Sequence, residues 1–90
     1  MISEEEGKAI ARSHLDTMEK EAGEELAIQK IERHASGSWI VYWNSSDFVR
    51  TKDRKAMLAG NGPILIDNNQ AVHKLDTSRN ILEQIDEILS

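Results

Sequence analysis

The segment Trp39-Ile40-Val41-Tyr42-Trp43 decides the fold, because five consecutive residues of high β-propensity predict a strand. Side chains alternate along a strand, so the two tryptophans and Val41 share one face, while Ile40 and Tyr42 share the other. Both faces are therefore apolar. This pattern is typical of a central strand that is covered on both sides, or of a strand whose outer face receives a partner.

Turn residues on either side of this strand predict the remaining strands of an antiparallel sheet. Upstream, Ser36-Gly37-Ser38 predicts a hairpin turn that connects it to a strand-length segment at Leu26–His34. Downstream, the breaker cluster Gly60-Asn61-Gly62-Pro63 leads into a short apolar strand at 64–66. The polar turn Asp67-Asn68-Asn69-Gln70 then connects that strand to the second arm of another hairpin. Two hairpins, and therefore about four strands, are expected.

A helix is predicted at each end of the chain. Ser3 and Glu6 form a capping box at the start of an apolar stripe with helical spacing, which predicts a helix over Ser3–Ala22. A second apolar stripe near the C-terminus predicts a closing helix that is capped by Thr77 or Ser78. Helices that flank a run of adjacent strands indicate an α+β fold. We expect both helices to pack on one face of the sheet.

Length and composition indicate one small globular domain over residues 1–90. Hydrophobic residues make up 39% of the chain, charged residues make up 30%, and the absence of cysteine excludes disulfides and thiolate chemistry. The net charge of −5 opposes binding to nucleic acid and favours a partner with a basic patch. The N-terminus is acidic and no apolar run is long enough to span a bilayer, so we expect a cytoplasmic protein without membrane contact.

The polar side chains show no spacing that is typical of catalysis or metal binding. The three histidines have no ligand spacing, and no serine lies in a G-x-S-x-G turn. The glycines of Gly60-Asn61-Gly62 precede a proline and a strand instead of opening a helix, which argues against a phosphate-binding loop. The basic segment Arg50–Lys55 is interpreted as a solvated loop, although contact with nucleic acid is the alternative. We expect no enzyme activity, no cofactor and no metal.

The aromatic residues have two interpretations. All four fall within ten positions of the chain: Trp39, Tyr42, Trp43 and Phe48. Aromatic side chains bury the most area per residue, so they are natural anchors of a small core. A tryptophan or tyrosine left on an outer face is instead typical of an interface hot spot. Core packing is the favoured interpretation for Trp39, and it is less favoured for Tyr42 and Trp43.

Two stretches of the chain, taken with the polar turn, short strand and helix that follow them, resemble the immunity protein 35 family, which is also called the YrhB-domain family. The stretches are Ser38–Ser45, which contains the strand tryptophan, and Leu58–Asp67, which matches L-x-G-N-x-P followed by three hydrophobic residues and an aspartate. The similarity covers essentially the whole chain. One departure is the turn Asn68-Asn69-Gln70, where the family usually has a glycine; asparagine adopts the same left-handed conformation.

The resemblance implies a toxin-neutralising immunity protein of a bacterial polymorphic toxin system, which binds and occludes a cognate toxin without catalysis. A chaperone-like or stress-related binding protein of the YrhB type is the alternative. The residues expected to form the structural motif are Trp39, Gly60, Gly62, Pro63 and Asp67. The candidate partner-binding residues are Trp39, Tyr42, Trp43 and Asn61. We expect a monomer or a weak homodimer.

Overall fold

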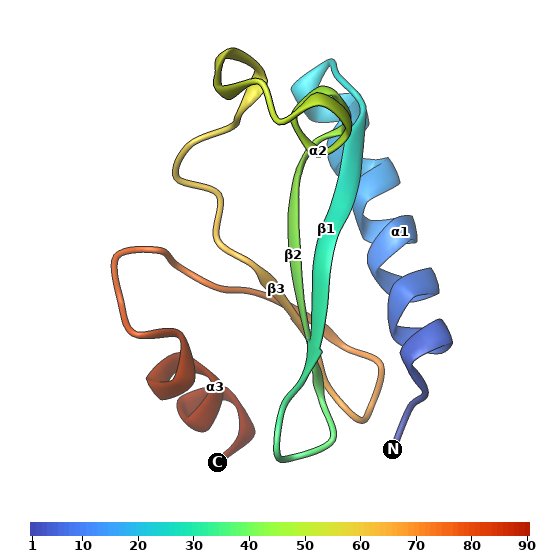
Figure 1. Cartoon of the computed structure of the whole chain (residues 1–90). Coiled ribbons are helices and arrows are strands. Elements are labelled where there is room, and N and C mark those ends of the chain that lie inside the picture. The colour runs from blue at the N-terminus through green and yellow to red at the C-terminus, as the bar shows by residue number, and fades with distance from the viewer.

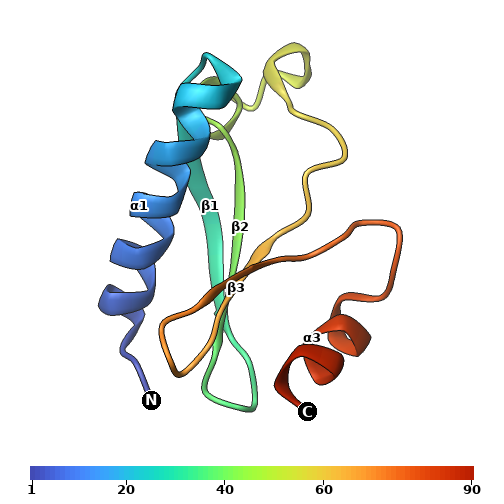
Figure 2. The same ribbon diagram turned by 180° about the vertical axis from the view of Figure 1, so that it is seen from behind.

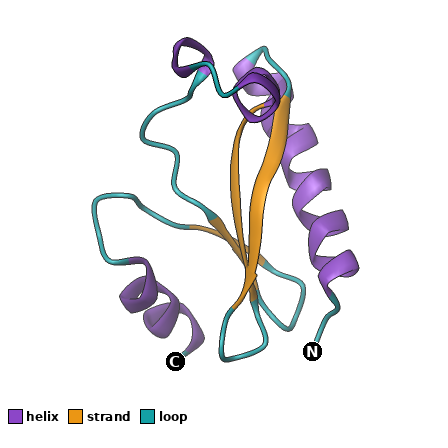
Figure 3. Cartoon of the chain, in the orientation of Figure 1, coloured by secondary structure: helices purple, strands orange, loops and turns teal.

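The computed structural model describes all 90 residues, from Met1 to Ser90 (Figure 1). Helices lie at both ends of the chain and the strands lie between them, as the colouring by secondary structure shows (Figure 3). The elements are α1 (Glu4–Ala22), β1 (Leu26–Arg33), β2 (Trp39–Ser45), α2 (Ser46–Thr51), the 3-10 turn η1 (Arg54–Ala56), β3 (Ile64–Ile66), β4 (Val72–Lys74) and α3 (Ile81–Leu89). None of the helices is both long enough and apolar enough to cross a membrane.

The four strands form one antiparallel sheet in the order β1-β2-β3-β4. The predicted α+β fold with two hairpins is therefore confirmed. The β1–β2 hairpin is long, and its register shifts by one residue between Ile28 and Lys30, so that Gln29 forms a bulge. The β3–β4 hairpin has only three residues on each strand, and its turn is the predicted segment Asp67–Gln70.

The two long helices lie on opposite faces of the sheet, as two views from opposite sides show (Figures 1 and 2). On the α1 side, Ala11 packs with Trp39 and Val41 of β2. On the α3 side, Ile85 packs with Ile40 of the same strand. The expectation that both helices pack on one face is therefore wrong. Since β2 is apolar on both faces, each face needs its own cover, and one helix supplies it on each side.

The start and end of α1 agree with the prediction. The Ser3 hydroxyl accepts a hydrogen bond from the Glu6 amide (3.1 Å), and the Glu6 carboxylate accepts one from the Ser3 amide (3.2 Å). This is the predicted capping box. Gly23 follows the helix with φ of 76°, a left-handed conformation that glycine adopts without steric cost and that ends the helix.

The predicted start of α3 is wrong, because Asn80 caps this helix instead of Thr77 or Ser78. The Asn80 side chain accepts a hydrogen bond from the Glu83 amide at 3.0 Å. Thr77 and Ser78 lie in a preceding turn, in which the Asp76 carboxylate accepts a hydrogen bond from the Ser78 amide at 2.9 Å. Thr, Ser and Asn are all good caps, so the sequence leaves the choice among them open.

Candidate partner-binding surface

Trp39 lies in the core beneath α1. Its side chain is 6% exposed, and its indole N–H donates to the carbonyl of Ile2 at 3.0 Å. One side of the ring lies against Gly7, where a Cβ atom would approach within 3.0 Å of the ring, and the Arg33 guanidinium lies 4.5 Å from its centre. A side chain covered in this way presents almost no surface to a partner. We therefore correct the expectation that Trp39 binds a partner and assign it to the core.

Trp43 and Asn61 fasten the loop before β3 to the end of β2. The indole N–H of Trp43 donates to the carbonyl of Gly62 at 3.0 Å. In return, the side-chain amide of Asn61 donates to the carbonyl of Trp43 at 2.8 Å. Both residues are half-buried. The polar groups of these two candidates are thus engaged within the chain, and only part of each side chain is accessible.

Two further residues at the end of β2, which the sequence analysis did not single out, extend this attachment. The Asn44 side chain accepts from the Leu58 amide (2.8 Å) and donates to the Leu58 carbonyl (3.3 Å). The Ser45 hydroxyl donates to the Ala56 carbonyl (2.6 Å) and accepts from the Phe48 amide, which caps α2. In the sequence they appear as two polar residues directly after the apolar run Trp39–Trp43, and in the structure both are buried. Buried polar side chains of this kind require internal partners.

The residues of the Gly60–Pro63 motif shape the entry of the chain into β3. Gly60 adopts φ of 78°. A Cβ atom on Gly62 would overlap the backbone carbonyl of Leu75, because the chain after β4 crosses Gly62 at this point. Pro63 is buried, and its carbonyl accepts a hydrogen bond from the Leu75 amide at 3.0 Å. These contacts explain the motif as a close backbone crossing rather than as a binding loop.

Asp67, the last residue of the motif, holds the β3–β4 turn. One carboxylate oxygen accepts from the amides of Asn69 (2.8 Å) and Ala71 (2.9 Å), and the other lies 2.8 Å from the Nε2 atom of His73. Desolvation is the largest single effect and raises the pKa of Asp67. The hydrogen bonds from His73, Ala71 and Asn69 together outweigh it, so the pKa of Asp67 lies below its ordinary value.

Tyr42 lies on the opposite face of β2 from Trp39, where it borders an open groove. The ring is half-buried and packs against the apolar cluster beneath α3. The groove has a volume of about 510 Å³ and is lined by Gln29, Lys30, Tyr42 and Lys52. The Lys30 ammonium lies 5.7 Å from the centre of the tyrosine ring and forms an ion pair with Glu32. Of the sequence-predicted candidates, Tyr42 is therefore the one that lines an open surface.

Lys52 enters this groove from the end of α2. It adopts φ of 61° and follows the helix as its C-terminal cap, a left-handed position that glycine or asparagine normally occupies. The groove therefore combines an aromatic ring from β2, two residues at the β1 bulge and the lysine that follows α2. Such a surface can bind a protein segment through the ring and donate hydrogen bonds from the ammonium groups to carboxylate or carbonyl oxygens.

His14 lines a second hollow, between α1 and β4, with Ile10, Ser13, Thr17 and Val72. Its Nε2 atom is buried and has no hydrogen-bond partner. Burial first, and then the charge of Lys74, hold the pKa of His14 below its ordinary value of 6.5. The folded protein thus favours the neutral imidazole. No group of three or more histidine, aspartate or glutamate side chains is arranged to hold a metal ion.

Acidification is therefore expected to destabilise the protein through His14. Below about pH 6.5 the unfolded chain takes up a proton on this histidine more readily than the folded chain, so the free energy of unfolding falls. Urea unfolding at about pH 7 and about pH 5 measures the drop in the free energy of unfolding between the two pH values. This drop should be smaller for His14→Leu than for the wild type. Val72→Ala, which changes the same hollow without removing a titratable group, is the control and should keep the wild-type loss. Equal losses in the wild type and His14→Leu would contradict this assignment.

The fold and the groove define a small α+β protein. It has an open groove around Tyr42, and its Gly60–Pro63 motif packs against the backbone of the same chain at Leu75. The family model described as Immunity protein 35 matches residues 5–87. The chain belongs to the immunity protein 35 family, so the resemblance seen in the sequence is confirmed. No curated protein and no solved structure matches the chain. Membership of this family indicates an immunity protein and suggests a non-catalytic role.

Proposed function

We propose that this protein neutralises a cognate bacterial toxin by binding the toxin and covering its active region, without catalysis of its own. Membership of the immunity protein 35 family supports the toxin as the partner. The observation that supports the binding mode is the position of Tyr42, a large ring at the edge of an open groove. In this proposal, the cell that makes the toxin holds the complex in its cytoplasm.

Contact through the Tyr42 groove would suit a tight and selective complex. A half-buried aromatic ring already has restricted motion, so a partner that covers it gains apolar contact at a low cost in side-chain entropy. Lys52 lines the same groove, and its ammonium lies 6.0 Å from the centre of the Phe48 ring. It has no salt bridge within the chain, so the ammonium group can pair with an oxygen of the partner. Trp43 and Asn61 do not line this groove, so in the proposal they act by holding the loop before β3 in place.

Co-expression with the toxin that is encoded beside the gene for this chain tests the proposal. We expect the chain to restore growth against that toxin and not against an unrelated toxin, because an immunity protein is selective. Failure to restore growth, with both proteins shown to be expressed, would contradict the proposal. Suppression of heat aggregation of several unrelated proteins, without rescue of growth, would favour the chaperone-like alternative instead.

A further inference from the structure

The outer edge of β1 is the longest free strand edge of the sheet, because β1 is the first strand in the sheet order and has eight residues. Hydrogen bonding alternates along an antiparallel hairpin, which fixes the residues that face outward. The backbone amide of His34 donates to the Ser38 carbonyl at 2.8 Å. The backbone groups of Glu32 and Lys30, which are two and four residues earlier, therefore also point toward β2. The N–H and C=O groups of Ile31 and Arg33 consequently point away from the sheet.

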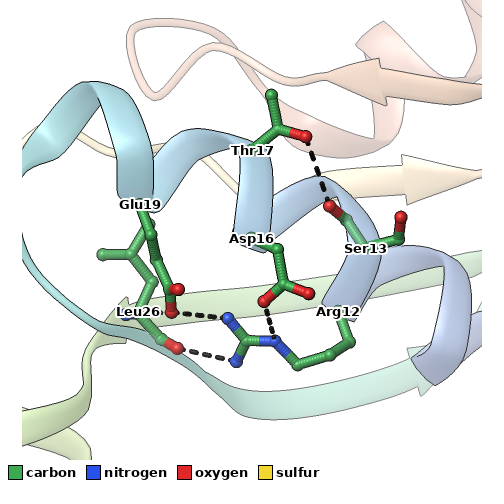
Figure 4. Close-up of polar contacts among 6 residues, drawn as sticks. All are labelled: Arg12, Ser13, Asp16, Thr17, Glu19 and Leu26. Carbon is green, nitrogen blue, oxygen red and sulfur yellow. Dashed lines mark hydrogen bonds and ion pairs between the residues drawn. The ribbon is translucent and has the colours of Figure 1, made fainter.

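The beginning of this edge is closed by side chains of α1 (Figure 4). Arg12 donates to the carbonyl of Leu26 at 2.7 Å, and Glu19 accepts from the amide of Leu26 at 2.8 Å. Arg12 also pairs with Glu19 (2.7 Å) and with Asp16 (3.0 Å), which fixes the clamp in place. Both outward groups of Leu26 are thus occupied. No comparable clamp covers Ile31 and Arg33 farther along the strand.

The open part of the edge is self-complementary in charge. Lys30 and Glu32 point to the α3 side of the sheet, since they pair with Tyr42 and Ile40 of β2. Ile31 lies between them and points to the α1 side, where it packs on the core. The sequence Lys-Ile-Glu therefore presents a cation, an apolar residue and an anion in a row. When two copies of this segment pair in antiparallel orientation, the lysine of each copy lies opposite the glutamate of the other.

We infer that a second copy of this chain pairs with β1 in an antiparallel register centred on Ile31, which joins the two sheets into one of eight strands. The outward groups of Ile31 in the two copies would exchange two hydrogen bonds across the twofold axis. Lys30 of each copy would then lie opposite Glu32 of the other. A pairing centred on Glu32, which is a register shift of two residues, would place the two Glu32 side chains opposite each other, where like charges destabilise the pair.

This arrangement predicts a weak dimer. The clamp at Leu26 and the bulge at Gln29 leave only a short stretch of edge available, and each copy carries a net charge of −5. The twofold axis would also place the two Tyr42 grooves on the same side of the joined sheet, since Lys30 lines the groove and lies at the edge. Because self-association is measured without any toxin, its failure would leave the proposed immunity function untouched.

Sedimentation of the whole chain tests the inference. Between about 10 µM and about 1 mM, the wild type should shift from the monomer mass of 10.2 kDa toward twice that value. Lys30→Glu and Glu32→Lys should each weaken the association about tenfold, because each variant places like charges opposite one another at two positions. Lys74→Glu, on the opposite edge strand β4, is the matched control and should associate as the wild type does.

Mixing the two variants provides the most specific observation. A heterodimer of Lys30→Glu with Glu32→Lys pairs opposite charges at both positions, so the mixture should associate more strongly than either variant does alone. Circular dichroism would show whether each variant folds. A wild type that remains monomeric at about 1 mM would overturn the inference, and so would a mixture of folded variants that fails to associate. Either result would mean that the lysine and the bulge protect the edge from pairing.

Discussion

Gly62→Ala is expected to lower the free energy of unfolding by about 3 kcal/mol or more, or to prevent folding altogether. The added Cβ atom would overlap the carbonyl oxygen of Leu75 and lie 2.7 Å from its carbonyl carbon. Both are backbone atoms, so no flexible side chain can move aside. Relief requires the chain after β4 to separate from the loop, which also breaks the hydrogen bond between the Leu75 amide and the Pro63 carbonyl.

Gly60→Ala is the matched control, two residues away in the same loop. Gly60 has a positive φ, but a Cβ atom there would meet no other atom within 4 Å. We therefore expect Gly60→Ala to lower the free energy of unfolding by only about 1–2 kcal/mol, which is the backbone cost of a left-handed conformation for alanine. Urea unfolding of both variants, compared with the wild type, measures the difference. Equal losses in the two variants would contradict the close crossing of the two backbones.

Tyr42→Ala is expected to weaken binding of the cognate toxin by about 30-fold or more, which corresponds to about 2 kcal/mol for a hot-spot aromatic residue. The reason is that Tyr42 is the one hydrophobic residue among the four that line the groove, while the other three are polar or charged. Isothermal titration with the purified toxin domain measures the affinity. Tyr42→Phe keeps the ring and should retain most of the binding energy.

The control for Tyr42→Ala must separate a loss of binding from a loss of stability. Ile88→Ala is suitable, because Ile88 packs on the same apolar cluster beneath α3 and does not line the groove. Both variants should lose some stability from reduced packing. Only Tyr42→Ala should lose affinity at a temperature where both are folded. An equal loss of affinity in the two variants would contradict a direct role for the tyrosine ring.

Local patterns predicted most of the fold. Three of these patterns involve only a few neighbouring residues and can therefore be recognised in the sequence. They are the capping box at Ser3, the apolar run of β2 and the turn residues of both hairpins. The placement of α3 is different, since it depends on the path of the chain between Lys74 and Asn80. There the Gln84 side chain accepts from the Asp76 amide (2.8 Å) and donates to its carbonyl (2.7 Å). No local pattern encodes that path.

The binding surface could be predicted only in part. Alternation along β2 separates Tyr42 from Trp39, but both faces of that strand are apolar, so the sequence cannot tell which one stays open. The other groove residues come from the β1 bulge and from the end of α2. Lys52 adopts a left-handed conformation without being glycine or asparagine, so it carries no recognisable signal. Their convergence is a product of tertiary structure alone.

The central claim is that this protein acts by covering a toxin and not by altering it. Titration of a fixed amount of active toxin with the purified chain tests this most directly, with the remaining toxin activity as the readout. We predict a linear fall that ends at a fixed stoichiometric ratio, and full recovery of toxin activity after the complex is separated in denaturant and the toxin is refolded. Complete inactivation by a small fraction of an equivalent, or toxin that stays inactive after separation, would contradict the claim.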